Sequence, residues 1–325
     1  MAEISMQKSS LRIEWVNICK GLGIFLVVIG HTSIAQISQT AYNWIYSFYM
    51  PMFYMLSGMM LNDSKYSDFQ FYIKRRLKTL IIPFFCLNTL LWLMVKGLNI
   101  SYIQTDFTEL LTGCLAMYFI RVLLVSELWY FAINKLVSDW KLKLFIIFLL
   151  IVLFDYLRGV IPEYIGLTRN EAIGVILPGM PLFYYAVGHI VRNMALNFNT
   201  QKLKYWLVSS VMIVLIIISC LLQPVSYGYF HIFPAFCGII TLGSLSILLS
   251  RLSVTLLNST VCFIGRNILI IVAFHQIIYN SMKILTNHLS LSTTLDAVLR
   301  LILLIFALYF LIRSFNKYAP WLVGR

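Results

Sequence analysis

Two ionisable residues, Lys20 and His31, lie eleven positions apart in the first apolar stretch of the chain. At about 100° per residue, eleven steps of an α-helix return to within about 20° of the same face, roughly 16 Å further along the axis. Imidazole titrates near neutral pH, so His31 is a candidate proton-transfer group. The alternatives are a lysine that snorkels to a membrane surface and a hydrogen-bonded interfacial histidine.

Three further ionisable residues, Arg121, Glu127 and His275, interrupt other apolar stretches. A charge inside a membrane span costs about 2.5–3.5 kcal/mol on insertion scales and usually faces the interior of the helix bundle. Arg121 and Glu127 are about 240° apart around one helix, so Glu127 is expected to pair with a base on another span and could orient His31 or Lys20. The alternatives are an ion pair for Arg121 and a structural hydrogen bond for His275.

The composition of the chain is typical of an integral membrane protein. Of its 325 residues, 60% are hydrophobic and only 11% are charged. A soluble domain carries roughly a quarter charged residues, so lipid must cover this surface. At about 20 residues per span, the length is expected to fold into one all-α transmembrane domain, residues 1–325, with about ten helices. The hydropathy pattern predicts spans near 15–36, 43–61, 79–97, 112–134, 142–160, 173–191, 205–222, 231–249, 264–284 and 297–314.

Basic residues alternate between the two sides of this predicted bundle. With the N-terminus inside, most Lys and Arg fall in cytoplasmic segments, and the opposite face holds only Lys96, Arg158, Arg169, Lys283 and Arg300. This positive-inside bias predicts that both termini are cytoplasmic. The net charge of +13 is spread between spans and forms no single basic surface, so we expect no nucleic-acid partner.

Metal binding is not expected. The six cysteines occur singly without CxxC spacing, and the five histidines show no HExxH motif. We therefore expect no metal site and no bound cofactor.

Five motifs occur in a fixed order along the chain, and each alone is short. They are RIEWVNICKGLGIFLVVIGH at 12–31, SFYMPMFYMLSG at 47–58, YIKRRLKTLIIP at 72–83, YFIR at 118–121 followed by Glu127, and FIGRNILIIVAFH at 263–275. Together they resemble the acyltransferase-3 family of integral membrane O-acyltransferases, in its fucose 4-O-acetylase-like branch. Three positions depart from the family pattern: Asn17 replaces an acid, Tyr49 replaces a histidine, and Lys78 (or Thr79) replaces the second arginine of the basic element.

The resemblance implies acetyl-CoA as donor and a hydroxyl of a cell-surface carbohydrate, or of a lipid-linked glycan, as acceptor. O-antigen, capsule and exopolysaccharide are the expected types of glycan, and a bacterial inner membrane is the expected location of this multi-pass protein. Arg75, Arg76 and Lys78 would then bind the phosphates of the donor, since guanidinium and ammonium groups suit phosphate. From charge alone, the same residues would be a positive-inside anchor.

Acyl transfer to a hydroxyl requires a base and a donor that stabilises the oxyanion. Within the resemblance, His31 is the expected base, Lys20 guides the donor toward it, and Glu127 supports this catalytic group. Arg121 is expected to stabilise the thioester oxygen or to bind the sugar, and His275 to lie on the acceptor side. An acyl-histidine relay is left open.

Two other functions fit the same length and hydropathy. The first is a ten-span small-molecule transporter of the drug/metabolite type, although such folds commonly contain internal repeats and none is visible here. The second is a non-enzymatic assembly partner of polysaccharide enzymes.

Overall fold

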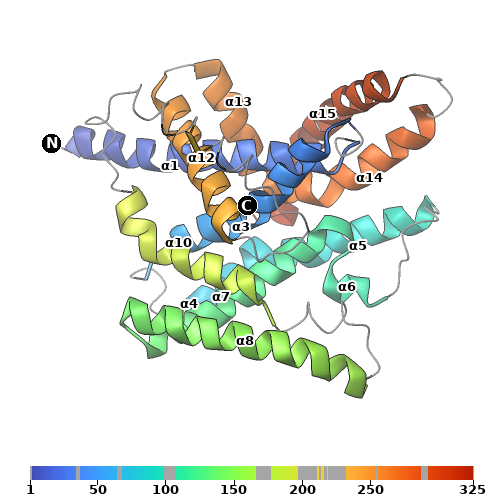
Figure 1. The fold of residues 1–325 in the computed structure, drawn as a ribbon. Helices are drawn as coiled ribbons and strands as arrows, with labels where there is room; N and C mark the ends of the chain where they lie inside the picture. Colours follow the sequence, from blue (N-terminus) through green and yellow to red (C-terminus); the bar gives the residue numbers. More distant parts are fainter. Residues whose placement is uncertain are drawn as a thin grey trace.

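The structure, a computed structural model, consists of helices and short connections, without strands, in the part of the chain that it describes (Figure 1). The described residues are 2–33, 37–63, 68–98, 107–165, 177–196, 232–252, 255–286 and 292–324, with single positions between 211 and 218. The helices are α1 (Ala2–Gly30), α3 (Gln39–Met59), α4 (Phe69–Arg76), η1 (Leu77–Ile81), α5 (Ile82–Gly97), α6 (Glu109–Thr112), η2 (Leu115–Met117), α7 (Tyr118–Leu136), α8 (Trp140–Ile165), α10 (Met180–Leu196), α12 (Ile232–Arg251), α13 (Thr255–Arg266), α14 (Ile268–Thr286), α15 (Thr293–Tyr318) and η5 (Pro320–Val323).

Several of these helices suit a membrane. Five segments are long and apolar enough to cross it: Phe69–Gly97, Leu115–Leu136, Ile232–Arg251, Ile268–Thr286 and Thr294–Tyr318. They support a multi-pass membrane protein, while a total of ten spans and the cytoplasmic position of both termini stay predictions. The predicted span at 205–222 lies outside the described residues, apart from single positions.

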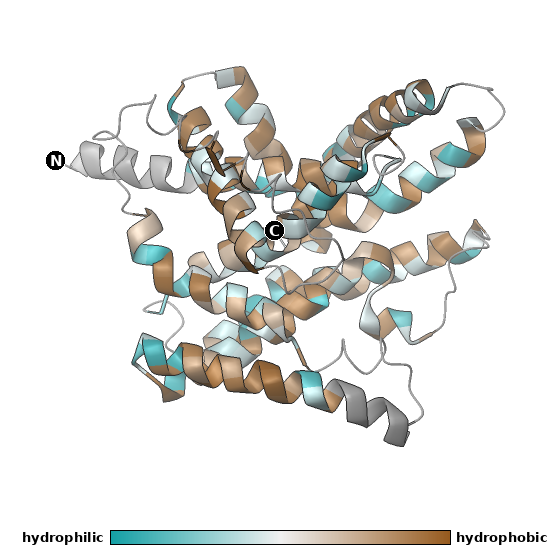
Figure 2. Cartoon of the chain, viewed as in Figure 1, coloured by the Kyte–Doolittle hydropathy of each residue, from teal (hydrophilic) through white to brown (hydrophobic). Residues whose placement is uncertain are grey.

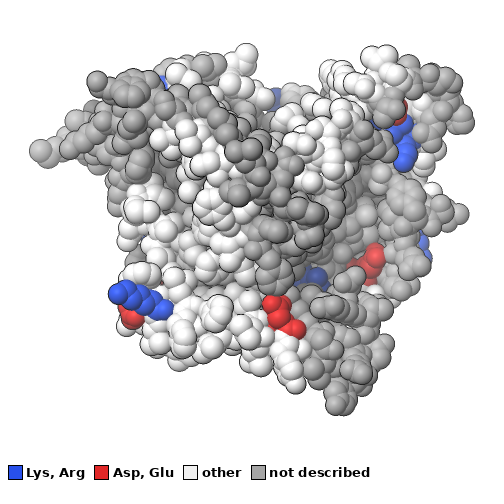
Figure 3. Space-filling model, viewed as in Figure 1, with Lys and Arg blue, Asp and Glu red and all other residues white. Residues whose placement is uncertain are grey.

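The outer surface of the bundle is apolar. Phe145 and Phe148 on α8, and Phe306 and Phe310 on α15, are exposed. Figure 2 shows hydrophobic residues running along both helices, and Figure 3 shows only scattered charged side chains among the described residues of this face. Hydrocarbon can cover such a surface without leaving polar groups unpaired, which is what a membrane bundle requires.

The helix over residues 69–97 begins ten positions earlier than the predicted span at 79–97. It contains one wider turn, η1, in which the N–H of Ile82 donates to the carbonyl of Leu77. Pro83 follows directly, and a proline inside a helix removes one N–H and crowds the carbonyl four residues earlier, which favours such a π-helical turn. Because the helix begins at Phe69, Arg75 and Arg76 lie on it rather than in the connection before it.

The span predicted near 264–284 is confirmed as α14, which begins four residues later than predicted because α13 ends at Arg266 and the helix breaks at Asn267. The Asn267 side chain donates to the carbonyl of Phe263 at 2.7 Å and accepts from Asn316 of α15 at 3.0 Å. Asparagine side chains that bond to nearby backbone compete with helix continuation. The short helix α13 then packs against α1, where a Cβ at Gly265 would lie only 2.1 Å from the Asn17 carbonyl oxygen.

Helix α3 lies at the centre of the fold and packs against α1, α10 and α12 (Figure 1). Its contact with α10 brings the two backbones together at glycines. A Cβ at Gly58 would lie 1.9 Å from the Tyr185 carbonyl oxygen, and a Cβ at Gly188 would lie 2.0 Å from that of Met55. Small residues allow this close approach, which replaces the hydrophobic driving force that lipid does not supply.

We predict that Gly188→Ala destabilises the bundle by about 1–3 kcal/mol, because the added methyl group meets backbone that cannot move away. The matched control is Gly243→Ala on α12, where a Cβ would meet nothing within 4 Å. Thermal melting of the purified variants measures the effect. Equal melting temperatures for both variants would contradict the close α3–α10 contact.

Candidate functional site

Helix α1 carries Lys20 and His31 at two levels of the bundle. Lys20 is half-buried in the helix and close enough to Arg76 for their charges to interact. His31 lies in the turn that ends the helix, where its N–H donates to the carbonyls of Val27 and Val28 at 3.1 and 3.2 Å. The two predicted residues therefore belong to two separate polar clusters.

The first cluster surrounds the His31 imidazole. Its Nδ1 lies 3.2 Å from the Tyr46 hydroxyl of α3 and 2.9 Å from the Gln276 side-chain nitrogen of α14. The ring of His275 lies alongside, with 5.2 Å between ring centroids and 47° between the planes. The sequence analysis missed Tyr46 and Gln276, because uncharged polar residues in an apolar stretch give a weak signal. The one available sign was that Gln276 adjoins His275.

His275 is a buried histidine with a defined tautomer. Its Nδ1 lies 2.7 Å from the Ile271 carbonyl oxygen and 3.2 Å from that of Val272. Carbonyl oxygens only accept, so Nδ1 carries the proton and Nε2 is left with a lone pair. Nε2 is buried and has no hydrogen-bond partner among the described residues. The bond to backbone fits the alternative that His275 makes a structural hydrogen bond. The unpaired Nε2 fits the expectation that His275 lies on the side where the acceptor substrate binds.

A small cavity of about 20 Å³ adjoins His31. This volume is about that needed for one water molecule. Tyr49 and Phe53 of α3, Tyr118 at the start of α7 and Phe119 line it together with His31. Tyr49, which stands where the related motif has histidine, thus lies at the same cavity as the proposed base.

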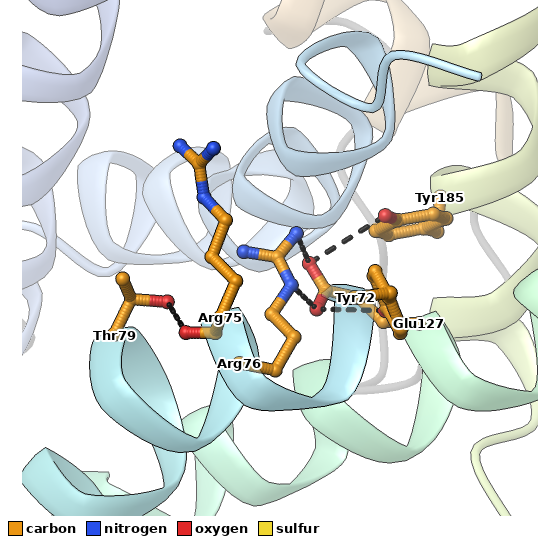
Figure 4. Close-up of polar contacts among 6 residues, drawn as sticks. All are labelled: Tyr72, Arg75, Arg76, Thr79, Glu127 and Tyr185. Carbon is orange, nitrogen blue, oxygen red and sulfur yellow. Dashed lines mark hydrogen bonds and ion pairs between the residues drawn. The ribbon is translucent and has the colours of Figure 1, made fainter. Parts of the chain in front are cut away.

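The second cluster is an ion pair between Arg76 of α4 and Glu127 of α7 (Figure 4). Arg76 Nε lies 2.8 Å from one carboxylate oxygen, and Nη2 donates to the other at 2.9 Å. The hydroxyls of Tyr72 and Tyr185 donate to the same carboxylate at 3.4 and 3.5 Å. The Glu127 side chain is 3% exposed, so this carboxylate depends on its protein partners rather than on water.

The partners of Glu127 differ from those expected. Its contacts in the described chain are with Arg76, Tyr72 and Tyr185, rather than with His31 or Lys20. Glu127 was expected to pair with a basic group on another span. That group is Arg76, which belongs to the motif that was expected to bind the donor. Lys20 lies near this cluster, close enough to Arg76 for the two positive charges to repel each other.

The remaining residues of the basic motif face other directions. Arg75 is half-buried and extends away from the Glu127 carboxylate (Figure 4), and its carbonyl accepts from the Thr79 hydroxyl at 3.0 Å. Lys78 is exposed. Since Arg76 is engaged by Glu127, the exposed Lys78 is the member best placed for an external anion.

Arg121 lies in the first turn of α7, closer to the helix start than the predicted span at 112–134 implied. Its Nε and Nη1 are buried and have no hydrogen-bond partner among the described residues. Among the described residues, the Tyr54 hydroxyl lies close enough to interact with the Arg121 charge. The expected alternative, an ion pair with an intramembrane acid, is absent from the described part of the chain, and unpaired buried donors are costly unless a ligand completes them.

A further polar chain was not predicted. His189 of α10 lies 3.3 Å from Asp63 through Nε2 and 2.8 Å from the Tyr130 hydroxyl through Nδ1. Asn134 donates to Asp63 at 2.8 Å and accepts from Lys143. Both ring nitrogens of His189 have partners, so this chain ties α7, α8 and α10 together. The histidine inside the predicted span at 173–191 was the available signal.

These clusters offer complementary chemistry. The His31 cluster can hold a proton-transfer group beside a cavity. Helix α7 lines that cavity with Tyr118 and Phe119, and Arg121 in the same turn offers unpaired N–H donors. The exposed end of the basic motif can bind an anion. Within the described residues, no group of His, Cys, Asp and Glu could hold a metal ion.

Comparison with protein-family models matches residues 13–314 to the acyltransferase-3 model, described as an acyltransferase domain. No curated protein and no solved structure gives a significant match to the chain.

We predict that Glu127→Ala destabilises the protein by about 3–5 kcal/mol, because it leaves the Arg76 guanidinium without its buried counter-charge. The double variant Arg76→Met with Glu127→Met removes both charges and should be clearly less destabilised than the single variant. Thermal melting in lipid nanodiscs measures both. A single variant that melts with the wild type would show that the pair contributes little.

Proposed function

Because the chain belongs to the acyltransferase-3 family, we propose that it is an O-acetyltransferase that moves an acetyl group from acetyl-CoA to a hydroxyl of a cell-surface carbohydrate. Family membership establishes a membrane acyltransferase; the acetyl donor, the carbohydrate or lipid-linked glycan acceptor, and the bacterial inner membrane belong to the proposal. The observation that carries it is the His31 imidazole, held by two other helices beside a cavity inside the bundle.

In this proposal His31 is the general base. It takes the proton of the acceptor hydroxyl as that oxygen attacks the thioester carbon, and the C–S bond to CoA then breaks. The imidazolium returns the proton to the departing thiolate, so atoms and charge balance. The cavity beside His31 has room for a hydroxyl group, the part of the acceptor that must reach the base.

The donor enters the proposal through the basic motif. Acetyl-CoA carries several phosphates, and Arg75 and Lys78 offer them a guanidinium and an ammonium group. Arg76 and Glu127 hold this segment of α4 against α7. Lys20, on the helix that also carries His31, guides the donor between the two clusters.

Arg121 and His275 complete the acceptor side. The unpaired N–H groups of Arg121 suit the oxyanion that forms at the thioester carbon or an oxygen of the sugar. The lone pair on Nε2 of His275 suits a second hydroxyl of the sugar, because that nitrogen can only accept.

We predict that His31→Ala abolishes the O-acetyl signal in NMR spectra of surface polysaccharide, while the protein reaches its normal abundance in the membrane. Loss of a general base typically costs about 10²–10⁴-fold in rate. The matched control is Thr32→Ala, since the Thr32 hydroxyl donates locally to the Ile29 carbonyl at the end of α1, at 2.6 Å. Full O-acetylation with His31→Ala would remove His31 from the mechanism, and small-molecule uptake without acetyl-CoA consumption would instead support a transporter.

We also predict that replacing both Arg75 and Lys78 with Gln raises the KM for acetyl-CoA about tenfold, since about 1.4 kcal/mol of lost binding corresponds to that factor. The ion pair of Arg76 stays intact in this variant, and thermal melting of the variant checks that it folds. The double variant Arg313→Gln with Lys317→Gln, at two exposed positions near the end of α15, serves as the charge-matched control. An unchanged KM in the double variant would return these residues to an anchoring role.

A further inference from the structure

Gln276 is in direct contact with the proposed base. We propose that it is a positioning residue for His31, whose amide oxygen accepts the Nδ1 proton and thereby leaves Nε2 as the basic nitrogen. This inference rests on the acyl transfer proposed above. An imidazole accepts a proton only through the nitrogen that carries a lone pair, and the partner of the other nitrogen decides which one that is.

The Tyr46 hydroxyl is a second partner of the same ring nitrogen. It is within 3.4 Å of the Gly30 carbonyl oxygen and 3.2 Å from Nδ1 of His31. Its single proton can point to either acceptor. When it points to Gly30, the Tyr46 oxygen can accept from a protonated Nδ1, which is the tautomer that the role of Gln276 requires.

The Gln276 amide must match this arrangement. Its nitrogen lies 2.9 Å from Nδ1, while its oxygen is buried and has no hydrogen-bond partner among the described residues. Rotation of the amide by 180° exchanges the two atoms, so that Oε1 accepts the Nδ1 proton and the NH₂ group takes the buried position that has no partner in the described part of the chain. An oxygen of the bound substrate can accept from the NH₂ group there.

With Nδ1 protonated, Nε2 of His31 is the nitrogen that can take a proton. It forms no hydrogen bond with any described residue, and the imidazole lines the cavity shared with Tyr49. His275 has the same tautomer, fixed by the Ile271 carbonyl. The two neighbouring imidazoles therefore both use Nδ1 to bond within the protein and both keep a lone pair on Nε2.

The kinetic test compares two substitutions of Gln276 in the purified protein. Gln276→Met keeps the shape but removes the acceptor, and should lower kcat on the order of 10²-fold with an unchanged KM for acetyl-CoA. Gln276→Glu keeps an oxygen that can accept from Nδ1 and should restore kcat to within a few-fold of wild type. Asn280→Leu, one turn along α14, is the matched control and should retain activity. A normal kcat in Gln276→Met, or no rescue by glutamate, would overturn the proposal.

A spectroscopic test is independent of activity. In ¹⁵N-histidine-labelled protein, the imidazole signals that disappear in His31→Gln belong to His31, and their shifts report its tautomer. The wild type should show the Nδ1-protonated form, and Gln276→Met should shift the population toward the Nε2-protonated form. An Nε2-protonated His31 in the wild type would overturn the role of Gln276. The expected tautomer in a protein that transfers no acetyl group would contradict the proposed function instead.

Discussion

A polar side chain inside a lipid-covered bundle has no water to bind, so its partners must come from other helices. This constraint explains why the ionisable residues of this chain occur in clusters. Glu127 is satisfied by Arg76 and two tyrosines, and His31 by Tyr46 and Gln276. Atoms that stay unpaired in the described structure, such as those of Arg121, mark places where a substrate can complete the set.

Close helix packing holds these clusters in register. Backbone approaches at glycine join α3 to α10 and α1 to α13, where a Cβ at Gly21 would lie 2.2 Å from the Val261 carbonyl oxygen. Helix α3 thus brings Tyr46 to His31, the proposed base, and α10 brings Tyr185 to the ion pair. A rigid backbone at these contacts positions side chains to within the distances that proton transfer requires.

The sequence predicted the helical class and the main candidate residues for clear physical reasons. Long apolar stretches indicated the spans, and the eleven-residue spacing placed Lys20 and His31 on one helix. The partner of Glu127 could not be predicted, because hydropathy does not say which helices touch. The break at Asn267 was missed because it depends on a side-chain bond to the backbone and a contact with α15. Gln276 was missed because its amide does not ionise, and ionisable side chains were the signal for candidate sites within the spans.

The most direct test of acyl transfer at His31 is a cryo-EM structure of the protein with a non-hydrolysable acetyl-CoA analogue. The acetyl group is expected within hydrogen-bonding reach of the His31 cavity, with the phosphates of CoA near Arg75 and Lys78. An acetyl group bound far from His31, with no path between them inside the bundle, would contradict the proposed site.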